Sequence, residues 1–115
     1  MIPIIFIILL IHEIKNKIIE QKTFTDLQKI IDNFDGEKLF LDSNYTFDSS
    51  KDITTGIIIK KSLSIHGKGY SINGLNQARI FEIYNSEVTI ERTMFINGFS
   101  KDSGGAINLI IQLYI

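Results

Sequence analysis

The sequence predicts an all-β fold, a parallel β-helix of about three coils that begins with a short capping helix. Isoleucine accounts for 25 of the 115 residues, whereas there is one proline and no tryptophan, and β-branched residues favour strands over helices. The apolar runs are three to five residues long, and turn residues such as Asn73-Gly74 separate them. These runs recur every 24 or 25 residues, a period typical of a solenoid and too short for a propeller blade.

The predicted strands can be aligned on this period. Leu41, Ile65 and Ile90 are separated by 24 and 25 residues. The aligned strands are Leu39–Leu41, Tyr45–Asp48, Leu63–Ile65, Tyr70–Asn73, Val88–Ile90 and Phe95–Asn97, and two further strands lie at Gly56–Ile59 and Arg79–Ile83. Each coil of such a stack bonds to the coils about 4.8 Å above and below it. We therefore expect Leu41, Ile65 and Ile90 to lie on neighbouring parallel strands.

Composition and charge argue against several classes of site. Twelve basic and 13 acidic residues give a net charge of −1, and the only arginines are Arg79 and Arg92. This is not the basic surface that a nucleic-acid backbone requires. The absence of cysteine excludes disulfides and thiolate chemistry. We expect no nucleic-acid partner, no metal and no cofactor.

Residues 1–22 are expected to be an apolar leader followed by a linker. Residues 1–11 carry no charge, but a membrane-spanning helix needs about 20 apolar residues. Their length is that of a signal-peptide core, although no basic residue precedes the run and no small-residue cleavage site follows it. We favour an export signal or a membrane-associating segment. The alternative is a buried or aggregation-prone apolar N-terminus.

Residues 23–36 are expected to form the capping helix. Thr25 and Gln28 match a capping box, in which each side chain bonds to the backbone of the other residue. The apolar stripe consists of Phe24, Leu27, Ile30 and Ile31. Because a helix of about two turns is not stable alone in water, this stripe must cover the first coil. Residues 37–115 would then be the coils.

Glycine and asparagine mark the expected turns, at Gly67, Gly69, Asn73, Gly74, Asn97, Gly98, Gly104 and Gly105. Asn73 and Asn97 recur at the same point of the repeat, where stacked side-chain amides can bond along the axis. Asn-Gly is also common in tight turns, because both residues tolerate positive φ. Both interpretations stay open, and we favour the plain turn.

The far end of the stack is expected to be incomplete. A fourth coil starts at residues 103–107, and the pattern is lost after Ile107 in a second apolar run. Because open strand edges pair with other chains, we expect self-association through this end. We interpret the chain as the N-terminal part of a longer solenoid.

A family resemblance rests on the run from Gly56 to Gly74 and on four shorter runs. These are Ala78–Phe81, Val88–Ile90, Phe95–Gly98 and Gly104–Ile107. The whole string, over about residues 23–107, resembles adhesin-like surface proteins, most of all those of methanogenic archaea. Phe-x-Asn followed by Gly-Gly-Ala-Ile is similar to the repeats of chlamydial polymorphic outer-membrane proteins. The resemblance implies a right-handed parallel β-helix of the pectate-lyase type and an exported, cell-surface region that mediates attachment.

Two function classes follow. We expect a non-enzymatic adhesion module at the cell surface whose partners are glycans or proteins of another cell. The alternative is the remnant of a carbohydrate-active enzyme, a polysaccharide lyase or hydrolase, which needs clustered carboxylates. The candidates for such a cluster are Asp42, Asp48, Glu82, Glu87 and Glu91, with Arg79 and Arg92 as the basic residues. Because no acidic pair recurs one coil apart, we favour a solvated outer face.

The histidines and one glycine pair add little support for catalysis. His66 has Ser62 and Ser64 nearby in sequence but no acid at a triad spacing, so we favour an exposed turn histidine. His12 is too distant in sequence to suggest a metal pair with it. The glycines around Lys68 lack the spacing of a phosphate loop.

Two features fit an external location. Asn44-Tyr45-Thr46 matches the acceptor pattern for an N-linked glycan, with Asn44 as the acceptor. Tyr45, Tyr70 and Tyr84 recur near coil boundaries, where they could stack on sugar rings or serve as structural residues with one exposed edge.

Overall fold

The computed structural model describes residues 3–5, 7 and 21–111. Most of the expected leader, His12 included, and the final residues 112–115 lie outside the described residues. In the part that is described, no helix is long and apolar enough to cross a membrane.

One helix and ten short strands make up residues 21–111. The helix is α2 (Phe24–Asn33). The strands are β1 (Lys22–Thr23), β2 (Lys38–Phe40), β3 (Tyr45–Thr46), β4 (Ile57–Ile59), β5 (Leu63–His66), β6 (Ser71–Asn73), β7 (Phe81–Tyr84), β8 (Val88–Glu91), β9 (Met94–Ile96) and β10 (Ile107–Ile110). Each predicted strand has a counterpart among β2 to β9. The pattern expected to end at Ile107 continues to Ile110 and pairs with β7.

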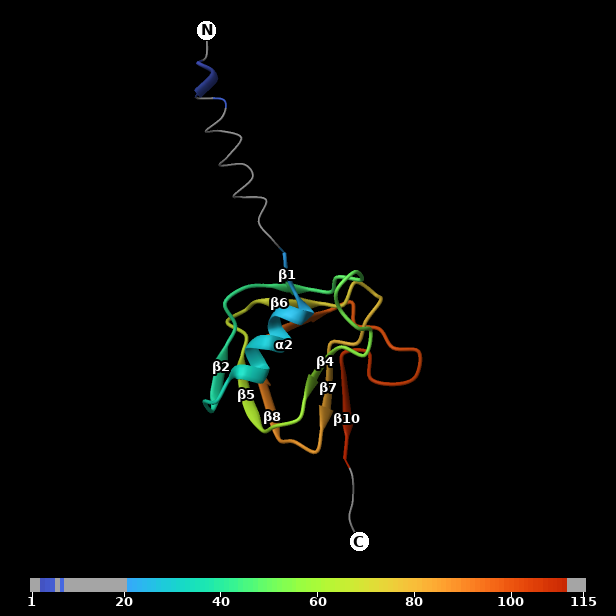
Figure 1. Cartoon of the computed structure of the whole chain (residues 1–115). Helices are drawn as coiled ribbons and strands as arrows, with labels where there is room; N and C mark the ends of the chain where they lie inside the picture. The colour runs from blue at the N-terminus through green and yellow to red at the C-terminus, as the bar shows by residue number, and fades with distance from the viewer. Residues whose placement is uncertain (1–2, 6, 8–20, 112–115) are drawn as a thin grey trace.

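The strands form three parallel sheets, in the orders β1-β3-β6-β9, β2-β5-β8 and β10-β7-β4 (Figure 1). Ile65 on β5 lies opposite Leu39 on one side and Ile90 on the other. We expected Leu41 opposite Ile65, but the residue that lies there is Leu39, two residues earlier. Leu39 and Leu41 are both buried and face the same way, so alternation alone does not distinguish the two registers.

The predicted fold class is wrong. We expected an all-β, right-handed parallel β-helix of about three coils. The described chain is instead a mixed structure, with three separate short sheets of three or four strands, one helix, and no closed sheet. The repeat period identifies which strands pair, but it carries no information on whether separate sheets join. The helix also supplies core residues, so the class is not all-β.

All three sheets and α2 share one core. Its fully buried members include Leu27 and Ile31 from α2, Ile65 from β5, Ile72 from β6 and Phe81 from β7. Because burying a side chain of this size contributes about 1.5–3 kcal/mol, the inward residues of the short strands hold the sheets together. Their outward residues are left for other roles.

The N-cap of the helix lies two residues earlier than the predicted Thr25. Its N-cap is Thr23, whose hydroxyl accepts from the Asp26 amide while the Asp26 carboxylate accepts from the Thr23 amide. Thr25 lies inside the helix and donates to the Asp52 carboxylate at 2.6 Å. The residue pattern misled because Thr23 and Thr25 are both followed three residues later by a side chain that can complete a capping box.

The two ends of the three sheets differ. At one end β1 covers β3, and Gln28 reaches from α2 to the backbone of β4. At the other end β8, β9 and β10 each lie at a sheet edge. Leu109 on β10 lies opposite the buried Ile83 but is 55% exposed, so inward-facing apolar side chains are left uncovered there.

Candidate functional site

The outward face of the β2-β5-β8 sheet carries an unusual mixture of side chains, and we call it the β2-β5-β8 outer face. Its two in-register rows are Lys38–Ser64–Thr89 and Phe40–His66–Glu91. Alternation along each strand places these residues on the opposite face from the buried Leu39 and Ile65 and the partly buried Ile90. The rigid strands therefore hold an aromatic ring, an imidazole and charged groups side by side.

Phe40 is the centre of this face. Its ring is 50% exposed, although phenylalanine is usually buried. The His66 ring lies 5.4 Å from it, centroid to centroid, at an interplanar angle of 36°. The ammonium groups of Lys68 and Lys38 lie 5.4 Å and 5.8 Å from the ring centroid. These cation–π contacts fix two positive charges beside an accessible aromatic surface.

His66 and Lys68 are tied together by the turn that follows β5. The Lys68 amide donates to His66 Nδ1 at 3.1 Å, so the neutral ring carries its proton on Nε2. Lys68 has φ +52°, which places it in the left-handed region. A side chain at Gly67 would meet the Arg92 carbonyl oxygen at 2.5 Å, so only glycine permits this close approach to the next turn.

Lys38 also forms an ion pair across the sheet. Its Nζ lies 2.6 Å from Glu91 Oε1, and both side chains are 44% exposed. The hydrogen bond from the Lys38 ammonium lowers the pKa of Glu91 below its ordinary value. The row Phe40–His66–Glu91 therefore ends on a carboxylate that is ionised at neutral pH.

A shallow groove of about 490 Å³ lies at the start of the same strands. It is lined by Gly36, Glu37, Ser62, Leu63, Ser64, Glu87 and Thr89. The Ser62 hydroxyl oxygen accepts from the Glu87 amide at 3.0 Å. The hydroxyls and the carboxylates of Glu37 and Glu87 thus lie at one end of the β2-β5-β8 outer face, while the Phe40 ring and the ammonium groups of Lys38 and Lys68 lie at the other.

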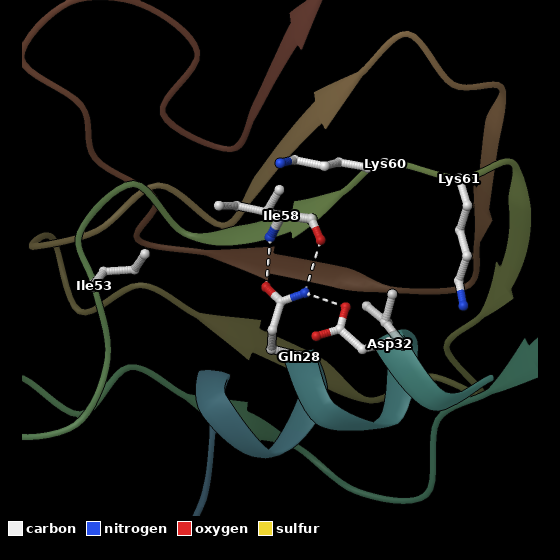
Figure 2. Close-up of a pocket in the computed structure, with 7 residues that line it drawn as sticks. Gln28, Asp32, Ile53, Ile58, Lys60 and Lys61 are labelled. Carbon is white, nitrogen blue, oxygen red and sulfur yellow. Dashed lines mark hydrogen bonds between the residues drawn. The ribbon is translucent and has the colours of Figure 1, made fainter.

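A second hollow, of about 460 Å³, lies between α2 and β4 (Figure 2). Its polar groups are engaged within the protein. Gln28 bonds to both backbone groups of Ile58 and to Asp32, Lys61 donates to the Phe34 carbonyl, and the Lys60 ammonium lies 5.6 Å from the Tyr84 ring centroid. We interpret this hollow as the junction that fixes the helix on the sheet.

The carboxylates predicted from the sequence are not brought together. Asp42 pairs with Lys22 at 2.9 Å and accepts from the Tyr45 hydroxyl at 2.7 Å, and these two bonds lower the pKa of Asp42. Asp48 accepts from Ser50. Among the described residues, no group of three or more His, Cys, Asp or Glu side chains could hold a metal ion.

Arg79 and Glu82 form a buried pair, with Nη1 and Oε1 3.4 Å apart. Arg79 also donates to the carbonyl oxygens of Gly104 and Ser103 and to the Ser100 hydroxyl, at 2.8–2.9 Å. The guanidinium group therefore holds the loop that precedes β10. Arg92 is exposed at the turn after β8, beside Glu91.

The tyrosines and Asn44 occupy different environments. Tyr45 is fully buried, and this burial raises the pKa of its phenol, so it offers no sugar-stacking surface. Tyr70 and Tyr84 are half-buried. Asn44 is exposed, and its side-chain oxygen accepts from the amide and the hydroxyl of Ser71 at 2.9 and 3.2 Å.

The expected turn residues lie in turns and close approaches between repeats. Asn73 accepts from the Leu75 amide through its side chain, as in a local turn, at 2.9 Å. Asn97 has φ +51°. Gly69 and Gly104 also have positive φ, while Gly74, Gly98 and Gly105 lie against backbone atoms of neighbouring segments. For Asn73 the plain turn describes the contacts better than an amide ladder.

Phe40 was missed as a functional residue. Because Leu39 and Leu41 face the core, alternation already places Phe40 on the outward face, as it does Lys38. An outward phenylalanine flanked by a lysine two residues earlier is the signal that would have found it.

No family model, curated protein or solved structure matches this chain.

Proposed function

We propose that this chain is a non-enzymatic binding module, exported to the cell surface, that holds saccharides on the β2-β5-β8 outer face. The observation that carries the proposal is the half-exposed Phe40 ring, supported from the side by His66 and flanked by Lys38 and Lys68. The adhesin-like resemblance of residues 23–107 points in the same direction.

An aromatic ring on a strand suits the apolar side of a sugar. Aromatic side chains combine a large apolar surface with a fixed geometry, and a strand residue held by packing is a more precise platform than a loop residue. The hydroxyls of Ser62, Ser64 and Thr89 lie near the amino ends of β5 and β8. They can exchange hydrogen bonds with sugar hydroxyls while the ring contacts the sugar carbons.

The openness of the face suggests weak binding at each site. Neither the ring nor the groove encloses a ligand, and a contact of this size supports affinities on the order of 1 mM, about −4 kcal/mol. A polymer that presents many sugars to many copies of the protein raises the overall affinity by multivalency. Attachment between two surfaces depends more on such multivalent binding than on tight binding of a single molecule.

A glycan array tests the proposal. The full chain is applied to neutral and acidic glycans beside two variants, Phe40→Ala and Phe99→Ala. Phe99 is also exposed, at 45%, but lies in the loop between β9 and β10. We expect Phe40→Ala to lose most of the signal and Phe99→Ala to retain it. Absence of any bound glycan, or an undiminished signal for Phe40→Ala, would overturn the proposal.

The enzyme alternative has its own readout. A soluble polysaccharide is incubated with the chain and its length is followed by size-exclusion chromatography. We expect no change in polymer length. Shortening of the polymer would support the remnant of a lyase or hydrolase and contradict a purely binding role.

A further inference from the structure

We infer that the saccharide is acidic, and that its carboxylate takes over the Lys38 contact that Glu91 makes in the free protein. This inference rests on the proposed function. Lys38 Nζ lies 2.6 Å from Glu91 Oε1 and 5.8 Å from the Phe40 ring centroid. A sugar ring seated on Phe40 therefore brings its ring substituents within reach of the same ammonium group.

The positive charges gather at the carboxyl ends of β5 and β8. Lys68 and Arg92 follow these strands and are exposed. The Gly69 amide donates to the Arg92 carbonyl at 2.8 Å, so their two turns lie directly against each other. Among the described residues, Lys68 and Arg92 form no ion pair. Lys68 thus lies beside the aromatic ring, and Arg92 lies in the adjacent turn.

The opposite end of the strands bears the other sign. Glu37 and Glu87 line the groove there. A densely charged polyanion laid along the face would meet these carboxylates and be repelled. A sugar that carries one carboxylate and several hydroxyls fits both ends, because its charge lies near the lysines and its hydroxyls face the groove. This argues for a saccharide that places a uronic acid carboxylate at the lysine end, and against nucleic acid.

Glu91 then acts as a built-in competitor. A ligand carboxylate reproduces the contact that Glu91 makes with Lys38, and the two carboxylates cannot share one ammonium group without repulsion. Removing the charge of Glu91 should free Lys38 and tighten binding. A residue with a merely structural role would not have this effect, because its loss would weaken the face or leave it unchanged.

Titration calorimetry with matched oligosaccharides tests the inference. The full chain is titrated with alginate oligosaccharides, which are uronic acid polymers, and with maltooligosaccharides of the same length, which are neutral. We expect Glu91→Gln to bind the alginate oligosaccharides roughly two- to fivefold more tightly, and Lys68→Gln to bind them weaker by a similar factor, as one exposed charge pair allows. Lys101→Gln, an exposed lysine in the loop before β10, should match the wild type.

The outcomes separate the inference from the function on which it rests. Equal binding of neutral and acidic oligosaccharides, or weaker binding by Glu91→Gln, would overturn the inference and leave the saccharide-binding function standing. Unchanged alginate binding by Phe40→Ala would show that charge alone attracts the polymer, and it would overturn both. Circular dichroism of each variant shows whether a loss of binding comes from unfolding.

Discussion

The side-chain amide of Gln28 pairs with the backbone of Ile58 as a neighbouring strand would. Gln28 Nε2 donates to the Ile58 carbonyl at 2.8 Å, and Gln28 Oε1 accepts from the Ile58 amide at 2.7 Å (Figure 2). β4 lies at the edge of its sheet. The amide of the preceding residue, Ile57, donates to the Ile80 carbonyl, and the Arg79 amide donates to the Thr54 carbonyl. One helical side chain therefore closes the free edge of a three-residue strand.

Replacing Gln28 should destabilise the protein. Gln28→Ala leaves the amide and the carbonyl of Ile58 without their partner in a part-buried position, at a cost of about 1–3 kcal/mol. Urea unfolding followed by circular dichroism measures this difference. Lys29→Ala, at the next and exposed position of α2, is the control and should change stability by less than about 0.5 kcal/mol. Equal effects of the two variants would contradict the edge-closing role.

The sequence predicted local structure better than assembly. Short apolar runs identified the strands, because alternation and turn residues are local signals. The register of β2 was predicted wrongly by two residues, since Leu41 is buried as well as Leu39. The role of Gln28 was not predictable, because its partner Ile58 is 30 residues away in sequence.

The candidate site was only partly predictable for a related reason. The sequence predicts that the charged residues lie on outward faces, and His66 and Glu91 do lie in one outward row. Phe40 was predicted only as part of the strand Leu39–Leu41, although its buried neighbours Leu39 and Leu41 already place it on the outward face. The approach of Lys68 to the Phe40 ring depends on the turn at Gly67, and sequence spacing does not reveal such a contact.

The buried pair of Arg79 and Glu82 offers a second stability test. Arg79→Ala leaves the Glu82 carboxylate buried without its partner and releases the loop at Ser103 and Gly104, so we expect a loss of about 3–5 kcal/mol. The double variant Arg79→Met/Glu82→Leu removes both charges and should lose clearly less. Denaturant unfolding of the two variants compares them. A double variant no more stable than Arg79→Ala would mean that the loop contacts, which both variants lack, outweigh the buried charge of Glu82.

Stability should fall in acid. Hydrogen bonds from the Thr23 backbone to Asp26, and from Lys22 to Asp42, lower the pKa of each carboxyl below its ordinary value of 3.8. Groups with a lowered pKa in the folded state contribute stability that is complete above about pH 4–5 and is lost as the pH falls through the lowered value. Urea midpoints measured between pH 7 and pH 2 should therefore decline below about pH 4.

A variant assigns part of this acid dependence to the helix cap. Asp26→Asn removes one of the carboxyls whose pKa is lowered in the folded state, so it should be less stable than the wild type at pH 7 and should show a smaller decline in acid. Glu37→Gln, an exposed carboxyl outside the cap, serves as the comparison. An Asp26→Asn profile parallel to that of the wild type would contradict the role of this carboxyl.

Self-association through the uncovered end remains a prediction. Leu109 is 55% exposed at an inward-facing position of the edge strand β10, and open edges pair readily. We expect the weight-average mass in sedimentation velocity to rise with concentration for the wild type, and not for Leu109→Lys. Ile53→Lys is the control, because Ile53 is 62% exposed beside α2. A monomeric wild type at every concentration would exclude this contact.

The central claim is that the β2-β5-β8 outer face binds the saccharide. The most direct test is a titration of the isotope-labelled full chain with alginate oligosaccharides, followed by the chemical shifts of backbone amides. We predict that the changes concentrate at residues 38–40, 64–68 and 89–92. Changes concentrated at residues 28–32 and 58–61, around the hollow between α2 and β4, or no changes at any amide, would contradict it.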